Sequence, residues 1–444
     1  MFGPLVLAYS AAQLLLGSPV VAVENGLART PPLGWNSWNW FACDISEETI
    51  LSAARAIVST GLKDAGYEYV IIDDCWHAPA RDPITKEPLA NPVTFPSGIK
   101  SVADKVHDLG LKFGIYSDAG SETCARRFGS LGYEQIDAKT YASWGVDYLK
   151  YDNCNNEGFS GNESISSWRF SQMAKALNET GRPIVYAMCN WGEDHSWTWA
   201  GKLANSWRMS GDISDMFTGY SKDCPCTSLL NCTTFGHHCS ATRIIDWTAY
   251  MVNYAGPGGW NDLDMLEVGN GNMTNDEYVT HFSMWALLKS PLILGNYLTK
   301  MTPDILDIIT NDAIIAVNQD PLGASIKRSW KRLLEEGDVQ MWTGPLADGS
   351  TVVALMNTSP DPQTATISFK DIPSKSPNPE TTTFRAFDLW QRSSELTRSG
   401  TRWGLDIGLF QGQISDITLK RHQTKVFMLV PQVRTTLRIQ EDAE

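Results

Sequence analysis

The chain has 444 residues, of which 43% are hydrophobic and 10% aromatic, so it carries enough apolar material for two folded domains. Its formal net charge of −14 argues against a nucleic-acid partner, because phosphate contacts need clustered Lys and Arg. The same acidic balance fits a soluble extracellular protein.

The first 24 residues have the composition of a secretory signal peptide. Residues 5–23 are mostly apolar and end in small side chains, with Ala22 a suitable residue before the cleavage point, although no Lys or Arg precedes the apolar stretch. Gly17, Ser18 and Pro19 break this stretch, and no later one is long enough to span a membrane. We therefore expect a secreted protein without a membrane partner.

Short apolar runs alternate with amphipathic stretches over residues 33–298. Eight runs are expected to be strands: residues 33–38, 67–75, 112–118, 146–154, 183–191, 206–212, 259–265 and 292–298. Helices are expected between them, among others at residues 47–62, 99–109, 133–144, 166–177 and 275–289. Eight strand–helix units over about 250 residues predict an α/β fold, a (β/α)8 TIM barrel, which we assign to residues 25–322.

After residue 322 the pattern changes to short strand-like runs separated by Gly, Pro, Asp and Ser. These runs are residues 339–342, 351–356, 364–369, 383–389 and 426–430. They predict a C-terminal antiparallel β-sandwich over residues 323–444, with no residues that suggest chemistry.

Charged and aromatic side chains gather where the predicted barrel strands end, which is the face that carries the active site in a TIM barrel. Lys150 and Asp152 should point the same way on the fourth strand, as should Arg208 and Asp212 on the sixth. The backbones of these two strands lie about 10 Å apart. Their Asp side chains can then approach to about 5–5.5 Å, the separation found in retaining glycosidases.

The two Asp residues are expected to have different roles. Lys150 lies beside Asp152 and should keep that carboxyl ionised, as a nucleophile requires. Asp212 suits a general acid if its surroundings raise its pKa. Arg208 acts against such a shift, and we expect it to engage substrate hydroxyls or another carboxylate.

Other residues at the strand ends have simpler explanations. A single Asp there is more often a loop or helix cap than a catalyst, and we expect such a structural role for Asp215. Asp262 and Asp264 are expected to support the site rather than to act in it. The Trp residues of this face can equally fill the core of the barrel.

Four segments together resemble glycoside hydrolase family 27. They are LGWNSW at residues 33–38, IDDCW at 72–76, YLKYDNC at 148–154 and WRMSGD at 207–212. The resemblance extends over about residues 26–430 and looks closest to the secreted melibiases of that family. It implies a retaining exo-α-galactosidase, acting on melibiose- and raffinose-type oligosaccharides and galactomannan side chains, with no metal and no cofactor.

The resemblance also implies a role for each matching residue. Asp152 corresponds to the nucleophile and Asp212 to the acid/base. The residues expected to contact the sugar are Asp73 and Asp74 at the 4- and 6-hydroxyls, Lys150 at further hydroxyls, Arg208 near the 2-hydroxyl, Cys189 and Trp191 around the 2-position, Trp35 as an aromatic wall, and Tyr116 at the end of the third strand.

Nine cysteines lie in the first 240 residues, an odd number that allows four disulfides and one free thiol in an oxidising compartment. A thiolate metal site is not favoured, because Cys224 and Cys226 lack the usual two-residue spacer. The resemblance implies that the pairs are Cys43–Cys75, Cys124–Cys154, Cys224–Cys239 and Cys226–Cys232. Cys189 would then be the free thiol.

Five N-glycosylation sequons agree with secretion. They begin at Asn162, Asn178, Asn231, Asn272 and Asn357. The last is the least favourable, because Pro360 follows its Ser359.

Two other functions were weighed against an α-galactosidase. An α-N-acetylgalactosaminidase on the same scaffold needs space at the sugar 2-position, which Trp191 and Arg208 are expected to fill. A non-catalytic galactose-binding protein needs neither a nucleophile nor an acid, whereas Asp152 and Asp212 are both present. Release of nitrophenol from the α-galactoside separates an enzyme from a binding protein.

Overall fold

The computed structural model describes residues 23–219, 224, 239–373, 378–393 and 401–432. The expected signal peptide therefore lies almost entirely outside the described residues, as do Cys226, Cys232 and Asn231. Within the described ranges, no helix is long and apolar enough to cross a membrane.

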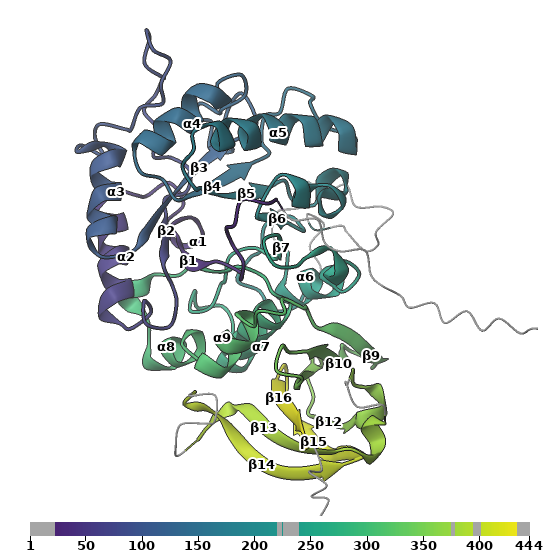
Figure 1. The fold of residues 1–444 in the computed structure, drawn as a ribbon. Coiled ribbons are helices and arrows are strands. Elements are labelled where there is room, and N and C mark those ends of the chain that lie inside the picture. The colour runs from purple at the N-terminus through teal and green to yellow at the C-terminus, as the bar shows by residue number, and fades with distance from the viewer. Residues whose placement is uncertain (1–22, 220–223, 225–238, 374–377, 394–400, 433–444) are drawn as a thin grey trace, which may run out of the picture.

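Eight parallel strands form the core of the N-terminal domain (Figure 1). They are β1 Leu33–Asn36, β2 Tyr69–Ile71, β3 Lys112–Asp118, β4 Tyr148–Asp152, β5 Val185–Cys189, β6 Ser206–Arg208, β7 Trp260–Asp262 and β8 Leu292–Leu294. Their order in the sheet is β7-β6-β5-β4-β3-β2-β1-β8, and a parallel bridge from Leu266 to Leu294 joins the segment after β7 to β8. The predicted TIM-type barrel is confirmed.

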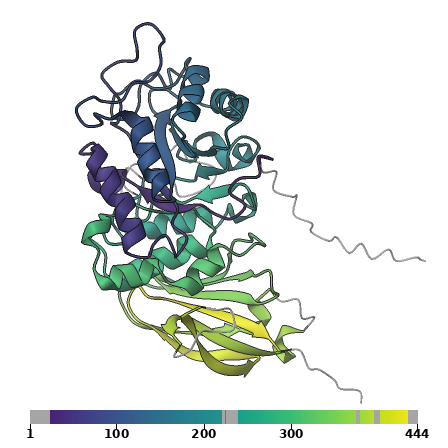
Figure 2. The same ribbon diagram turned by 60° about the vertical axis from the view of Figure 1, so that its left-hand side comes forward.

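Helices surround these strands (Figures 1 and 2). They are α1 Trp38–Phe41, α2 Glu47–Ser59, α3 Gly98–Asp108, α4 Glu134–Ser143, α5 Glu163–Glu179, α6 Ala241–Thr248, α7 Asn275–Leu287, α8 Pro303–Ile309 and α9 Asp312–Asn318. The start of α2 follows from its sequence, because the Ser46 hydroxyl caps the Thr49 N–H and Glu47 and Glu48 complement the helix dipole. The apolar residues of α2 at helical spacing, such as Ile50 and Ile57, are buried against the barrel.

The C-terminal domain is an antiparallel sandwich, as predicted. A six-stranded sheet has the order β14-β13-β16-β11-β10-β9, and β12 pairs with β15. The strands are β9 Lys327–Leu333, β10 Asp338–Pro345, β11 Thr351–Asn357, β12 Gln363–Ser368, β13 Thr383–Arg392, β14 Trp403–Gln411, β15 Gln413–Leu419 and β16 Thr424–Pro431. The sequence pattern missed β9, which is rich in Lys and Arg, β14, which contains two glycines, and β15, whose outer face is polar.

The sandwich packs against the side of the barrel that carries α7, α8 and α9 (Figures 1 and 2). Its residues Trp342, Val352, Met356, Leu389 and Val426 belong to the same buried hydrophobic cluster as the barrel interior. A second cluster, around Phe384, lies within the sandwich itself. The two domains are thus joined by a shared buried apolar cluster as well as by the polypeptide chain.

One expected glycosylation site conflicts with this fold. Asn357, at the end of β11, is fully buried, and its side-chain amide donates to the carbonyl oxygens of Asp361 at 2.9 Å and Lys420 at 2.8 Å. A glycan has no access to an amide whose two hydrogens are already bonded inside the protein, so the expectation for Asn357 was wrong. Asn162, Asn178 and Asn272 are exposed.

Candidate active site

A cavity of about 610 Å³ opens at the carboxyl ends of the barrel strands. Its walls contain acidic residues from several strand ends together with Lys150 and Tyr116. In chain order, the expected site residues that line it are Asp73, Asp74, Tyr116, Lys150, Asp152 and Asp212. The structure thus brings six residues, separated by up to 139 positions in sequence, around one space.

Asp152 is the last residue of β4, and its side chain is buried. The Tyr116 hydroxyl donates to Asp152 Oδ2 at 2.9 Å, and the Asn153 N–H donates to Oδ1 at 3.0 Å. Burial raises the pKa of Asp152 to about 6, and the charge of Asp212 adds to this, while Lys150 and the Tyr116 hydrogen bond act in the opposite direction. The expected influence of Lys150 exists, but burial outweighs it.

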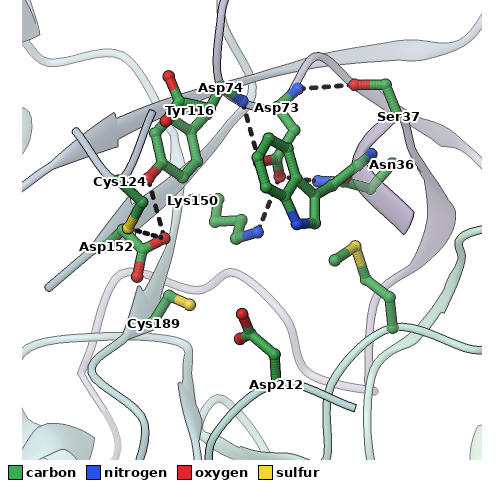
Figure 3. A network of polar contacts seen from close by, with 12 residues as sticks. Asn36, Ser37, Asp73, Asp74, Tyr116, Cys124, Lys150, Asp152, Cys189 and Asp212 are labelled. Carbon is green, nitrogen blue, oxygen red and sulfur yellow. Dashed lines mark hydrogen bonds and ion pairs between the residues drawn. The ribbon is translucent and has the colours of Figure 1, made fainter. Parts of the chain in front are cut away.

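Lys150 lies between Asp152 and Asp73, with its Nζ atom 2.8 Å from Asp73 Oδ2. Burial opposes its charge, but the nearby carboxylates, Asp73 above all, hold its pKa well above the ordinary value. Asp73 Oδ2 also accepts from Asn36 Nδ2 at 2.7 Å, and the Ser37 hydroxyl accepts from the Asp73 N–H at 3.0 Å. Figure 3 shows these contacts fixing Asp73 and Lys150 on one side of the cavity.

Asp74 is fixed by the loop that follows β3. Its Oδ1 accepts from the Thr123 hydroxyl at 2.9 Å and its Oδ2 from the Ala125 N–H at 2.9 Å. Burial raises the pKa of Asp74, although these hydrogen bonds oppose the shift. Asp73 and Asp74 therefore present oriented carboxyl groups to the cavity at adjacent positions.

Asp212 occupies a different environment, in the loop after β6. Strand β6 ends at Arg208, four residues earlier, so strand alternation does not set the direction of Asp212 as expected. Its side chain is 37% exposed, and Arg208 Nη2 lies 3.0 Å from Oδ1. Arg208 is itself buried and pairs with Asp264 at 2.7 Å, which matches the expectation that it engages a carboxylate.

Asp264 supports this loop from behind. Its Oδ2 accepts from the Ile213 N–H at 2.8 Å, directly after Asp212, and it also binds Arg208. Burial raises the pKa of Asp264 to about 7, against the opposing charge of Arg208. Asp264 therefore holds both the backbone and the cation next to Asp212.

The two carboxyl groups face a common space (Figure 3). Asp152 and Asp212 point into it from different elements, with Cys189 between them and the Lys150 ammonium group nearby. Asp152 is buried near Lys150, whereas Asp212 is partly exposed and paired with Arg208. This arrangement suits a reaction in which one group attacks a carbon atom and the other exchanges a proton with a leaving oxygen.

Two expected sugar-contacting residues lie elsewhere. Trp35 is fully buried, its indole N–H donates to the Asn296 carbonyl at 2.8 Å, and it does not line the cavity; Trp38 and Trp40 do. Trp191 is also outside the cavity lining. Strand β5 ends at Cys189 and Trp191 has a left-handed backbone with φ of 58°, so strand alternation does not apply between the two residues.

Cys189 and Arg208 lie just below the cavity. Both line a much smaller space of about 20 Å³, together with Lys150 and Asp264. Arg208 Nη1 lies 3.4 Å from Cys189 Sγ, and burial raises the pKa of the Cys189 thiol well above its usual range. They are therefore placed beneath the expected sugar position, beside Asp212.

Several residues that line the cavity were not predicted to contact the substrate. They are Trp38, Asn39, Trp40, Asp215, Met265, Glu267, Asn270 and Asn272. Asp215 accepts from the Asn272 N–H and the Tyr278 hydroxyl, a structural role in a loop like the one expected for it, although it also lines the cavity. Burial raises the pKa of Glu267 to about 8, and its Oε1 accepts from Asn39 Nδ2 at 2.7 Å. The polar segment after β7 is the sequence signal that could have found those of them that follow β7.

Three disulfides lie among the described residues: Cys43–Cys75, Cys124–Cys154 and Cys224–Cys239. These pairs agree with those that the family resemblance implied. Cys189 is buried and unpaired in the described part of the chain. Asp118 lies close to Cys124 and Cys154, but the two sulfurs are bonded to each other, which removes them as thiolate metal ligands.

Comparisons with known proteins agree with this geometry. A family model described as alpha galactosidase A matches residues 30–320, and one described as the alpha galactosidase C-terminal beta sandwich domain matches residues 336–429. An α-galactosidase of Schizosaccharomyces pombe is 47% identical over 389 residues, which cover 87% of this chain and 89% of that protein. The chain belongs to the glycoside hydrolase family 27 α-galactosidases.

Two further relatives extend this finding. An α-galactosidase of Cyamopsis tetragonoloba is 45% identical over 410 residues, covering 92% of this chain and 88% of that protein. A structure of the α-galactosidase from Saccharomyces cerevisiae with raffinose is 38% identical, with a TM-score of 0.88 over 93% of this chain and all of that chain. The chain is thus a glycoside hydrolase of the retaining type that acts on α-galactosides.

Proposed function

We propose that the chain is a secreted exo-α-galactosidase in which Asp152 is the nucleophile and Asp212 the acid/base. The observation that carries this assignment is the pair of carboxyl groups facing one space, Asp152 buried beside Lys150 and Asp212 more exposed and paired with Arg208. Asp73, Asp74 and Lys150 would hold hydroxyls of the galactose ring beside them. Such a clamp positions the anomeric carbon between the two carboxyl groups.

The reaction then has two steps. In the first, an Asp152 carboxylate oxygen attacks the anomeric carbon, the glycosidic bond breaks, and Asp212 gives its proton to the departing oxygen. This leaves a β-linked galactosyl ester on Asp152. In the second, Asp212 removes a proton from water, whose oxygen attacks the same carbon and releases Asp152 and α-galactose.

Oligosaccharides of the raffinose type are the substrates that we expect. The cavity of about 610 Å³ is lined by Trp40, Glu267 and Asn270 in addition to the expected galactose contacts, and these residues would contact a leaving sugar. The Saccharomyces cerevisiae relative whose structure contains raffinose supports this substrate class. Galactomannan side chains are the larger substrate that we expect the enzyme to accept.

The decisive experiment follows the product by NMR. Hydrolysis of the nitrophenyl α-galactoside should release α-galactose first, and Asp152→Asn should lose nearly all turnover while it still binds galactose. Initial release of the β-anomer would contradict a double displacement.

For Asp212→Ala, we expect a larger loss of kcat/KM on melibiose than on an activated aryl galactoside, because an acidic leaving group needs little protonation.

The expected preference for galactose over N-acetylgalactosamine rests on Cys189 and Arg208 and no longer on Trp191. Trp191 does not line the cavity, so crowding at the 2-position would come from Cys189 and Arg208, which lie beneath it. Arg208 cannot withdraw easily, because it is paired with Asp264 and Asp212. We expect kcat/KM to be higher for the galactoside than for the acetylated sugar; comparable values on both would support an α-N-acetylgalactosaminidase instead.

A further inference from the structure

A tight turn of the sandwich, residues 420–423 between β15 and β16, contacts the barrel. Here it is called the sandwich turn. The Lys420 N–H donates to Gln423 Oε1 at 3.0 Å, and Asn357 holds the turn from the neighbouring strand through its side chain at Lys420 O and its N–H at Gln423 O. His422 has a left-handed backbone with φ of 55°. The turn is therefore a well-anchored support that projects His422 out of the sandwich.

The His422 side chain is buried between two parts of the barrel. Its Nδ1 lies 2.5 Å from Glu277 Oε1 on α7, and its ring stacks on Phe217 with ring centroids 4.6 Å apart. The Thr280 hydroxyl of α7 donates to the His422 carbonyl at 2.8 Å. Phe217 ends the segment that begins at Asp212, here called the acid loop (residues 212–217).

The first turn of α7 connects His422 to the cavity wall. Glu277 uses its other oxygen, Oε2, to accept from the Thr274 N–H at 2.7 Å in the capping box that starts the helix. The next residue, Tyr278, places its hydroxyl 3.2 Å from Asp215 Oδ1 in the acid loop. The N-terminal half of α7 thus contacts both the sandwich turn and the acid loop.

Backbone hydrogen bonds hold the acid loop at both ends, since the Cys239 N–H donates to the Asp212 carbonyl at 2.8 Å and the Thr242 N–H donates to the Phe217 carbonyl at 3.0 Å. Side chains add further contacts along the loop. Asp264 binds the Ile213 N–H, Tyr278 binds Asp215, and His422 covers Phe217. Asp212 itself lies beyond the end of β6, so the sheet does not hold it. Proton transfer to a leaving oxygen requires hydrogen-bond reach, and a displacement of about 1 Å in such a group can cost about 100-fold in rate.

We propose that His422 of the β-sandwich is a positioning residue for Asp212, and that the sandwich thereby takes part in catalysis through the acid loop. This inference rests on the proposed role of Asp212 as acid/base. His422 touches no substrate. It fixes the Phe217 end of the loop against α7, so that the Asp212 carboxyl stays within reach of the glycosidic oxygen.

The competing explanation is that His422 only stabilises the interface between the domains. Another contact of the same helix provides a matched control. Trp390 of β13 donates its indole N–H to the Ser283 hydroxyl of α7 at 2.8 Å, two turns further from the cavity, and does not touch the acid loop. Trp390→Phe removes a hydrogen bond between the sandwich and the same helix and leaves an aromatic ring in place.

The test compares leaving-group dependence in folded protein. His422→Gly removes the side chain without strain at a left-handed position, and Phe217→Leu removes the stacked ring from the loop side. We expect each to lose at least about tenfold in kcat/KM on melibiose, a substrate that needs protonation, and less than about threefold on dinitrophenyl galactoside. Trp390→Phe should lower the thermal midpoint without changing the ratio between the two substrates.

Asp212→Ala serves as the reference. If it shows the selective loss on melibiose while His422→Gly and Phe217→Leu lose equally on both substrates, His422 is only an interface residue and the proposal is overturned. If Asp212→Ala itself shows no selective loss, the acid/base assignment fails, and this inference fails with it. If His422→Gly is not recovered as folded protein, Phe217→Leu alone decides, since its change lies within the barrel.

Discussion

At Asp152, burial and the neighbouring Lys150 cation shift the pKa of the carboxyl group in opposite directions. Burial raises its pKa to about 6, and the charge of Asp212 contributes in the same direction. Lys150 and the hydroxyl of Tyr116 favour the ionised form but do not cancel the effect of burial. A nucleophile must be ionised, so activity should fall as the pH drops below about 6.

Tyr116→Phe should move this acidic limb to higher pH. The variant loses the hydrogen bond to Asp152 Oδ2, which favours the carboxylate, so the pKa of Asp152 should rise further. A hydrogen bond to a charged group is worth about 1.5–3 kcal/mol, and one pKa unit corresponds to about 1.4 kcal/mol, so we expect a shift of about one to two units. The measurement is the pH profile of kcat/KM.

Tyr151→Phe is the matched control for that shift. Tyr151 precedes Asp152 on β4, and its hydroxyl is buried without a hydrogen-bond partner among the described residues. Its removal should leave the acidic limb where it is. Equal shifts in both variants would mean that the limb responds to general changes in the barrel and not to the bond at Asp152.

Trp35 and Trp38 should respond differently to substitution. Trp38→Ala should raise KM, because Trp38 lines the cavity. Trp35→Phe leaves the buried Asn296 carbonyl without its donor, so it should lower the free energy of unfolding by about 1–3 kcal/mol with little effect on KM. Steady-state kinetics and urea unfolding of both variants separate the two effects; a raised KM in Trp35→Phe alone would restore Trp35 as the aromatic wall.

At the level of elements, the hydrophobic pattern predicted the barrel well but not the points at which its strands end. Buried runs identify a strand, whereas its end depends on which backbone groups find a partner in the neighbouring strand. β4 continues to Asp152, so alternation placed Lys150 and Asp152 correctly around the cavity. β6 stops at Arg208, so the same argument failed for Asp212.

The prediction that Trp35 forms an aromatic wall of the sugar site shows the same limit of the strand argument. β1 ends at Asn36 and α1 begins at Trp38, so the direction of side chains changes from a period of two to a helical one within two residues. Nothing in the local sequence marks this change. Further lining residues were missed for a related reason, since Trp40 comes from the four-residue helix α1 and Glu267 from the loop after β7, and the placement of both depends on long-range contacts.

Variants at the start of α7 can separate the effect of the helix cap on stability from the effect of a glycan at Asn272. Thr274 is the N-cap of α7 and also the third residue of the Asn272 sequon. Thr274→Ala should cost about 1 kcal/mol of stability through the cap, whereas Thr274→Ser should cost little and keep the sequon. Asn272→Gln removes only the sequon. Urea unfolding and mass spectrometry of the three variants from a glycosylating host provide the measurement; equal destabilisation by Asn272→Gln would assign the effect to the glycan.

On the scale of the whole molecule, the domains are joined by more than their connecting segment. Interfaces between domains of one chain are usually modest and polar, which allows independent motion. Here Trp342, Val352 and Met356 extend the buried apolar cluster of the barrel into the sandwich. The buried Asn311 side chain of the barrel also donates to the Leu389 carbonyl of β13 at 3.0 Å. Such an interface couples the stability of the two domains.

We therefore expect the barrel and the sandwich to unfold in one transition. Phe384→Ala tests this, because Phe384 is fully buried in the separate core of the sandwich, away from the cavity. Truncating a buried Phe costs about 3–5 kcal/mol. If the domains are coupled, this loss should lower the midpoint of thermal inactivation by several degrees, in step with the calorimetric midpoint, while kcat/KM at low temperature stays unchanged. Two calorimetric transitions, with the activity following only the unshifted one, would show that the barrel is stable without the sandwich.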